Sequence, residues 1–385
     1  MESVSRRSAV LGALGVAGAV VAGCSAEAPV QTQAPTAPVA PVESATPTPT
    51  VDTTPRWPLT GKVLKDADDA KRIAVAVKVP DNKGEHPQMG LEKADIVFVQ
   101  LDGYPAAVGQ SGTRLMPVFH SQYADTVNPV RSIRPVDIPA LSPITAIIGN
   151  TGAYPWVMGY AETFGEFLVP TKYYMAAKGT GAYSILGSRV RTLNGVTYYD
   201  RAVACHPKQL AKLTKKFNDG PQQNYFPWAA SDDEVSTEVS GKAASFVSVP
   251  WKKQNTYDMS YTWSGKAGRY LRSMPWGKHI LASGKQVACD NVLVIRAKQV
   301  FGKIYPDGRI KTEGAFHYEP IHQIIETEGT FYYAHGGKYV KGTWTKGAVN
   351  EVFSFTLDDG TDLKMAPGQT YVELPNYNAK IVVKG

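Results

Sequence analysis

The sequence predicts an α+β fold with a β-rich second half, and three observations carry this prediction. Between residues 57 and 230, short apolar runs typical of strands alternate with helix-like segments. From residue 231 to residue 385, strand-like runs recur between turn signals. The 385-residue chain is 43% hydrophobic and 19% charged, as expected of a soluble protein that can bury a sizeable core. We therefore expect an α/β domain over residues 57–230 and a mostly antiparallel β domain over residues 231–385.

The first of these domains contains four expected strands and one well-marked helix. The helix is expected over Pro207–Asn218, because Leu210, Leu213 and Phe217 fall on one face and proline suits a first helical turn. The strands are expected at Ile73–Val79, Ile96–Leu101, Arg114–His120 and Ile144–Ile148.

The second domain contains strands joined by hairpin turns. His335-Gly336-Gly337 and Asp358-Asp359-Gly360 are typical hairpin turn sequences. The strands are expected at Thr256–Trp263, Val287–Ala297, Ile324–Ala334, Tyr339–Thr345, Val352–Leu357 and Thr370–Leu374.

The N-terminus has the pattern of a lipoprotein signal peptide. Arg6 and Arg7 precede an apolar stretch from Ala9 to Gly23, and small residues then lead to Cys24. As a helix the stretch is about 22 Å long, which is short of the roughly 30 Å hydrocarbon core of a bilayer. We expect residues 1–23 to be removed and Cys24 to carry the lipid, through either the twin-Arg or the general secretory route. This places the protein on the extracytoplasmic face of the cell membrane.

Residues 24–56 are expected to form a disordered tether. Seven prolines and seven threonines occur between Ser25 and Arg56, with no aromatic residue. Such a segment cannot bury enough apolar surface to offset the entropy of ordering it.

Two cysteines remain for the body once Cys24 is assigned to the lipid. An even pair in an oxidising compartment favours a disulfide between Cys205 and Cys289, and two separate buried thiols are the alternative.

The segment from Asn128 to Pro135 is the strongest candidate for a binding site. Asn128 and Pro129 could begin a helical turn that brings Arg131 and Arg134 to one face, although Pro135 restrains Arg134 toward extended geometry. With Arg114, these arginines and Ser132 would form a clamp for a phosphate or carboxylate. The alternative is structural, with each arginine paired to a nearby carboxylate.

Catalytic and metal signatures are weak. His206 directly precedes the expected helix at Pro207 and could act as a base, or serve only as a cap. His317 and His322 are five residues apart around Pro320, which does not suit metal ligation on a helix, and no cofactor motif occurs. The tryptophans, Trp156 among them, could stack on sugar rings but are more typical of core positions.

The net charge of +7 is spread along the chain. Without a basic stripe or a known module, the sequence does not predict nucleic-acid binding.

Eight short segments resemble the YerB-like lipoproteins, a bacterial family without an assigned activity, over residues 57–375. The segment Pro129-Val130-Arg131-Ser132-Ile133-Arg134-Pro135 is the most specific. The others are Trp57-Pro58-Leu59-Thr60-Gly61, Gly90-Leu91-Glu92-Lys93-Ala94-Asp95-Ile96-Val97, Thr113-Arg114, Tyr270-Leu271-Arg272, Asp290-Asn291-Val292, Gly342-Thr343-Trp344 and Pro367-Gly368-Gln369-Thr370. The resemblance implies a layered β-β-α first domain and a separate β-rich second domain.

The chain departs from the family pattern at three places where the family has histidine or aspartate residues. These are Gly149-Asn150-Thr151-Gly152, Cys205-His206-Pro207 and His279-Ile280-Leu281. The departures favour binding over catalysis in this member.

Three functions follow from these patterns. The first is a non-enzymatic, lipid-anchored envelope protein that binds an anionic cell-wall ligand or a protein partner through Arg114, Arg131, Ser132 and Arg134. The second is an envelope hydrolase or transferase that uses His206. The third is a scaffold for envelope complexes.

Overall fold

A computed structural model describes residues 54–103, 112–251, 257–312 and 317–385. Residues Asp52–Gly385 form one compact unit. The expected signal peptide, Cys24 and nearly all of the expected tether lie outside the described residues, as does Thr256 at the start of one expected strand.

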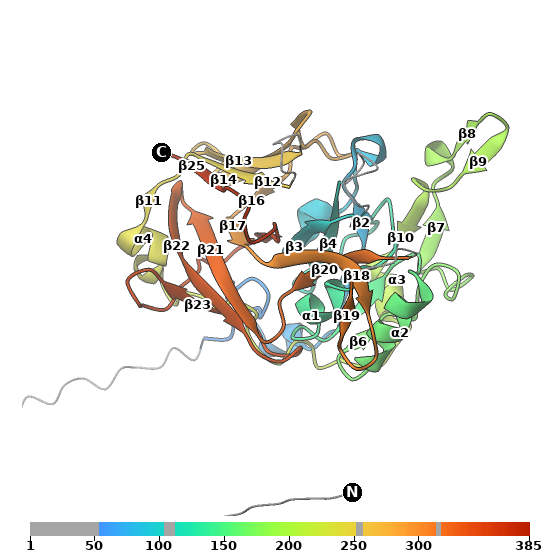
Figure 1. Cartoon of the computed structure of the whole chain (residues 1–385), viewed down its shortest axis with the longest axis horizontal. Coiled ribbons are helices and arrows are strands. Elements are labelled where there is room, and N and C mark those ends of the chain that lie inside the picture. The colour runs from blue at the N-terminus through green and yellow to red at the C-terminus, as the bar shows by residue number, and fades with distance from the viewer. Residues whose placement is uncertain (1–53, 104–111, 252–256, 313–316) are drawn as a thin grey trace, which may run out of the picture. The chain divides into compact units, whose positions relative to one another are not determined.

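The largest sheet joins strands from both halves of the body (Figure 1). Its strands, in spatial order, are β11 (Lys242–Ala243), β22 (Lys338–Lys346), β21 (Thr327–His335), β17 (Asn291–Ile295), β24 (Thr370–Glu373), β3 (Ile96–Leu101), β4 (Thr113–Phe119), β1 (Ala74–Val77), β5 (Ala146–Gly149) and β6 (Leu168–Val169), with β2 (Val79–Pro80) on β4 and β23 (Ser354–Leu357) on β22.

Strand β24, near the C-terminus, connects the two halves. It lies between β17 and β3 and is parallel to both, with Thr370 opposite Ile96 and Glu373 opposite Val99. Every residue of β3 is buried, which explains why Ile96–Val99 is a continuous apolar run rather than an alternating one. Strands from both sides of residue 230 therefore share one sheet, and one continuous hydrophobic cluster runs through both halves.

A second sheet is antiparallel and buries one face. Alternate residues of β14 are buried, so its period of two matches a half-exposed sheet. Its strands are β15 (Gly277–Lys278), β14 (Arg269–Met274), β13 (Asp258–Ser264), β12 (Phe246–Pro250) and β25 (Val382–Lys384), with β16 (Ala288–Cys289) on β14.

Three smaller sheets complete the strands. They comprise β19 (Ile310–Lys311), β18 (Lys298–Ile304) and β20 (Glu319–Gln323), then β10 (Val203–Cys205) with β7 (Tyr183–Ile185), and β8 (Arg191–Leu193) with β9 (Val196–Tyr198).

Helices are few and short: α1 (Asp137–Leu141), α2 (Pro155–Thr163), α3 (Pro207–Ala211) and α4 (Ser236–Ser240). The helix expected over Pro207–Asn218 begins at the predicted proline but ends early. The Thr214 hydroxyl accepts a hydrogen bond from the Lys216 backbone N–H at 3.1 Å, and Phe217 has a φ of 63°. Local bonding of this kind competes with helix continuation, so the predicted length was wrong.

The fold is thus mostly β with a minor helical part, which confirms the α+β, β-rich prediction in outline. The layered β-β-α arrangement of the first domain stays a prediction. Among the helices in the described part of the chain, none is long and apolar enough to span a membrane.

Candidate functional site

The residues from Val130 to Arg134 do not form the expected helical turn. They have no regular secondary structure, and the next helix, α1, begins only at Asp137. The side chains of Arg131 and Arg134 consequently contact different partners.

Arg134 is buried, and its guanidinium group contacts other residues of the protein. Its side chain is 5% exposed, and its Nε lies 3.0 Å from Glu319 Oε2 and donates to the Asp102 backbone oxygen at 2.7 Å. Arg114 on β4 pairs with the Asp102 carboxylate and donates to the Ser132 backbone oxygen at 2.6 Å. Both guanidinium groups therefore already have carboxylate partners.

Arg131 is the most exposed of the three, with 28% of its side chain accessible. It pairs with Glu85 and lies 3.5 Å from Asp200. An anionic ligand at Arg131 would have to compete with these two carboxylates. The geometry of all three arginines matches the structural alternative that the sequence left open.

Arg114 and Arg134 belong to a buried, charge-balanced cluster. Lys78 Nζ contacts Asp137 at 2.8 Å and Gln100 at 2.6 Å, and burial lowers the pKa of Lys78 to about 8. The cluster contains three cations, Lys78, Arg114 and Arg134, and three carboxylates, Asp102, Asp137 and Glu319. A balanced cluster has little excess positive charge with which to attract an anion.

His206 lies at the start of α3, as predicted, and both ring nitrogens have partners. Nε2 is 2.9 Å from Ser184 Oγ on β7, and Nδ1 is 3.1 Å from the Asp125 backbone oxygen. Here a serine hydroxyl contacts an imidazole, and a backbone carbonyl orients that imidazole. This arrangement is seen in nucleophilic catalysis. Ser184 could not be recognised from the sequence, because its neighbours form no nucleophile motif.

The predicted disulfide between Cys205 and Cys289 is not formed, so that prediction is wrong. Cys205 and Cys289 are both buried free thiols. Cys205 lies on β10 with its sulfur against Gly149, whereas Cys289 lies on β16 beside β14 in the antiparallel sheet. Burial raises the pKa of both thiols.

In the described part of the chain, one group of side chains has donor atoms close enough together to hold a metal ion. Single donor atoms of Asp81, His86 and His279 all lie within 4.8 Å of one another. The guanidinium of buried Arg272 contacts His279 Nδ1 at 2.7 Å and Asp81 at 2.8 Å, so a metal ion here would face a fixed positive charge. We assign these residues to a structural ion-pair network between the two halves.

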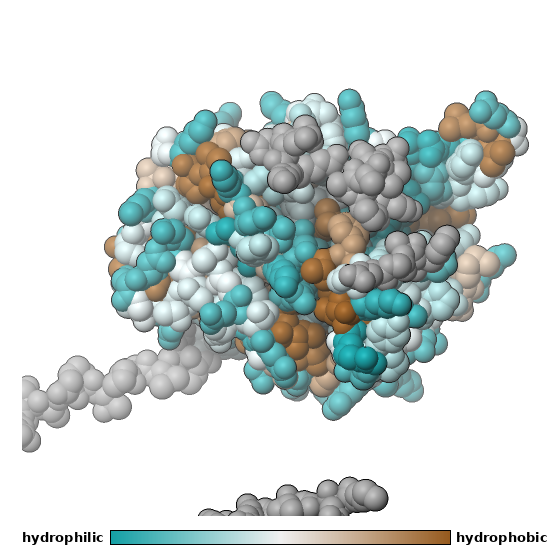
Figure 2. All heavy atoms as spheres, in the orientation of Figure 1, coloured by the Kyte–Doolittle hydropathy of each residue, from teal (hydrophilic) through white to brown (hydrophobic). Residues whose placement is uncertain are grey.

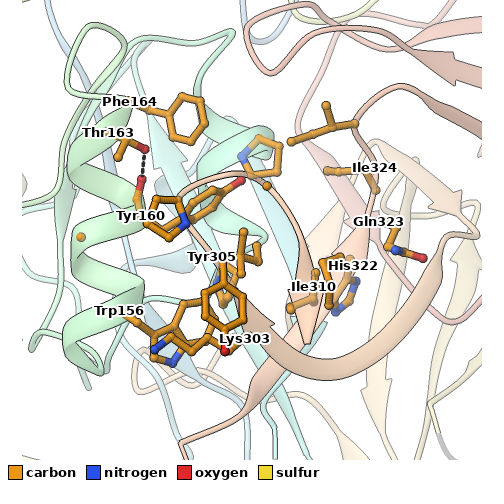
Figure 3. Close-up of a pocket in the computed structure, with 18 of the residues that line it drawn as sticks. Trp156, Tyr160, Thr163, Phe164, Lys303, Tyr305, Ile310, His322, Gln323 and Ile324 are labelled. Atoms are coloured by element: carbon orange, nitrogen blue, oxygen red, sulfur yellow. Dashed lines mark hydrogen bonds between the residues drawn. The ribbon is translucent and has the colours of Figure 1, made fainter. Parts of the chain in front are cut away.

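A different feature, an aromatic-lined cavity, offers the clearest space for a ligand (Figure 3). Its volume is about 680 Å³, and it lies between α2 of the first half and strands β18 and β20 of the second. Trp156, Tyr160 and Phe164 line it from the α2 side, and Tyr305 and Ile310 face them from the other wall (Figure 3).

The walls of the cavity are mainly apolar, and their polar side chains are Thr163, Lys303, His322, Gln323 and Glu326. The Trp156 indole N–H donates to the His317 backbone oxygen at 2.8 Å, and the Thr163 hydroxyl donates to the Tyr160 backbone oxygen at 2.6 Å. Burial raises the pKa of Tyr160 to about 12 and lowers that of His322 to about 3, so both are neutral near pH 7. Lys303 has no ion-pair partner among the described residues and is the cation that lines the cavity.

The sequence contained a signal for one wall of this cavity. Trp156, Tyr160 and Phe164 recur every four residues after Pro155, a helical stripe that could have marked α2. The other wall comes from strands more than 130 residues later, and no local pattern links the two.

Comparison with known proteins identifies relatives of the chain. A domain described as "Protein of unknown function (DUF3048) N-terminal domain" matches residues 59–201, and the corresponding C-terminal domain matches residues 247–372. A relative named as a lipoprotein, YerB of Bacillus subtilis (strain 168), is 25% identical over 334 residues, which cover 85% of this chain and 88% of the relative.

A solved structure supports the fold. The crystal structure of YerB from Bacillus subtilis has a TM-score of 0.63 and 22% identity, and the match covers 85% of this chain and 99% of that chain. With both DUF3048 domains present in order and a relative aligned over most of its length, the chain belongs to the YerB-like family, as the resemblance in its sequence implied.

Proposed function

We propose that the chain is a lipid-anchored protein of the extracytoplasmic membrane face that binds the apolar part of an envelope amphiphile, without catalysing a reaction on it. The anchoring part of the proposal rests on the Arg6–Cys24 sequence pattern and on a relative that is named as a lipoprotein. The binding part rests on the cavity between α2 and strands β18 and β20.

The size and shape of the cavity carry the proposal. A volume of about 680 Å³ lies within the range of about 300–1,000 Å³ that is typical of small-molecule sites. Isoleucines and prolines share its walls with the aromatic side chains, and this composition suits a hydrocarbon chain better than a sugar. A sugar would need free hydrogen-bonding groups, and the Trp156 and Thr163 donors already have backbone acceptors.

Lys303 is the cation of the site, and the Glu326 carboxylate also lines the cavity. Its ammonium lies 5.4 Å from the centre of the Tyr305 ring, at a cavity wall. A ligand with an apolar chain and an anionic head could bury the chain and place the head near Lys303. This retains an anionic envelope ligand, as the sequence led us to expect, but moves it from the paired arginines to the cavity.

A substitution at Gly159 tests whether the cavity is the binding site. It lies on α2 and lines the cavity, and a Cβ atom built on it would meet no atom within 4 Å. Gly159→Phe should therefore fill the cavity without a backbone clash. Gly187→Phe is the matched control, since Gly187 also has open space around its Cβ but does not line the cavity.

The assay is titration with a fluorescent long-chain carboxylic acid, followed by its emission and by displacement with unlabelled amphiphiles. We expect saturable binding to the wild type and to Gly187→Phe, and at least tenfold weaker binding to Gly159→Phe. Equal binding by all three proteins would refute the cavity as the site.

The arginine site proposed from the sequence remains testable by itself. Arg131 is the accessible member, so Arg131→Ala is the informative change, with Arg269→Ala as a control because Arg269 is similarly exposed and also pairs with a carboxylate, that of Asp290. Binding to purified cell wall that Arg131→Ala leaves unchanged would exclude this site.

A second candidate function is hydrolysis, which the contact between Ser184 and His206 favours. An activated Ser184 would react with a fluorophosphonate probe, and the label would disappear in both Ser184→Ala and His206→Ala. Absence of labelling in the folded wild type would count against catalysis at this pair.

A further inference from the structure

A narrow β-hairpin projects from the body, and its residues from Thr192 to Tyr199 are exposed (Figure 1). Among the described strands, β8 and β9 pair only with each other, in the register Arg191 opposite Tyr198 and Leu193 opposite Val196. Asn194 and Gly195 form the turn with φ values of 50° and 76°, as a tight two-residue hairpin turn requires. An isolated two-stranded hairpin is only marginally stable in water, so its persistence here calls for a partner.

The tip of this hairpin is apolar. All residues from Thr192 to Tyr199 are exposed, and Leu193 and Val196 are 50% and 53% exposed. The register places these two side chains on the same face, opposite the face that carries Thr192 and Thr197. Figure 2 shows the corresponding brown surface on the arm at the upper right.

The residue types of the hairpin also change from its tip toward the body. Behind the apolar tip come Tyr198 and Tyr199, which are 39% and 53% exposed. Arg191 lies directly opposite Tyr198 and pairs with Asp200. Closer to the body lie Arg201 and Arg189, which donates to the backbone oxygens of Pro87 and Glu85. The arm therefore has an apolar tip, and its tyrosines and arginines lie behind that tip.

We propose that this hairpin, residues 189–201, inserts its tip into the surface of an anionic lipid bilayer. An apolar tip with tyrosines and arginines behind it matches the polarity of a membrane surface, in which the hydrocarbon lies beneath the interfacial and headgroup layers. Tyrosine partitions to the interfacial layer, and arginine is attracted to anionic headgroups. A protein partner would not require tyrosine and arginine side chains to lie together behind the apolar tip.

The expected anchor is compatible with this contact. About thirty residues separate Cys24 from the first described residue, and a flexible segment of that length averages about 30 Å end to end. A body held at that distance from the membrane can reach it with the arm. The inference stands apart from the cavity, which the hairpin does not line.

Vesicle binding by residues 52–385, a compact unit that lacks Cys24, tests the proposal. Vesicles of phosphatidylglycerol and phosphatidylcholine are compared with vesicles of phosphatidylcholine alone in a sedimentation assay. Leu193→Ser with Val196→Ser removes the apolar tip, and Thr192→Ser with Thr197→Ser is the matched control on the opposite face.

We expect binding to the anionic vesicles that the tip variant weakens about tenfold or more, while the threonine variant binds as the wild type does. Failure of the wild type to bind anionic vesicles would overturn the proposal and leave the apolar tip to a protein partner. Equal binding by the tip variant would also overturn it.

A fluorescent label provides a readout that does not depend on the stability of the tip variant. An environment-sensitive dye on Leu193→Cys should shift to the blue with anionic vesicles, whereas the same dye on Tyr377→Cys, an exposed position outside the hairpin, should not. The native cysteines Cys205 and Cys289 are buried and will not compete for the dye. An unshifted spectrum at Leu193→Cys would contradict insertion.

Discussion

Removal of the Asp81 carboxylate should strongly destabilise the protein, because it leaves a buried cation without its partner. Arg272 and Asp81 are both fully buried, and Arg272 Nη2 lies 2.8 Å from Asp81 Oδ2. Asp81 also accepts a hydrogen bond from the Thr113 hydroxyl at 2.8 Å. Burial by itself would raise the pKa of Asp81, but the Arg272 charge outweighs it and holds that pKa well below its usual range.

The expected magnitude for Asp81→Ala is a loss of about 3–5 kcal/mol in the free energy of unfolding, as for other buried pairs from which one partner is removed. Glu373, which lies 3.8 Å from Arg272 Nε, supplies only a partial replacement. An exposed pair gives the control: Lys338 and Glu238 are 2.6 Å apart, but their side chains are 40% and 41% exposed. Glu238→Ala should cost less than about 1 kcal/mol.

The assay is urea unfolding of residues 52–385 followed by tryptophan fluorescence. Asp81→Ala combined with Arg272→Met should recover part of the loss, because both charges are then gone. A loss below about 1 kcal/mol for Asp81→Ala, equal to that of the surface control, would show that the guanidinium is solvated and refute the reasoning.

Two further predictions concern pH and redox state. Burial lowers the pKa of His120 to about 4 and that of His322 to about 3. As the pH falls below about 6.5, these histidines therefore bind protons in the unfolded chain before they do so in the folded protein, which lowers the free energy of unfolding. Burial raises the pKa of Asp95 to about 6, and protonation of Asp95 changes the free energy of unfolding in the opposite direction. From these three groups we expect a net loss of about 2–3 kcal/mol in unfolding free energy between pH 7 and pH 5, measured by urea titration at each pH, and constant or rising stability would contradict it. For the cysteines, thiol titration in denaturant should find both Cys205 and Cys289 free, and reductant should leave the melting temperature unchanged. A mass two units lower in the unreduced body would instead establish a disulfide.

Local sequence patterns predicted individual elements well and their assembly poorly. The strand expected at Ile96–Leu101 has the bounds of β3, and His335-Gly336-Gly337 lies at the turn between β21 and β22. The pairing of β24 with β3 joins residues about 275 positions apart, and no local periodicity encodes that register. For this reason the sequence suggested two separate halves, whereas their strands share one sheet.

The same limit explains the arginine cluster. Arg114, Arg131 and Arg134 are conspicuous in sequence, and their spacing suggested a clamp. Their carboxylate partners, among them Glu85 and Glu319, come from segments that the sequence did not connect with them. The arginines alone suggested an anion site, but which carboxylates lie beside them and balance their charge depends on tertiary structure.

Native mass spectrometry of the protein purified from its own membranes tests whether the cavity beside α2 holds an apolar ligand. This measurement separates a lipid bound without a covalent bond from one attached to the chain. We predict a bound amphiphile that is present in the wild type and in Gly187→Phe and is lost in Gly159→Phe. The same bound mass in Gly159→Phe, or none in the folded wild type, would contradict the claim.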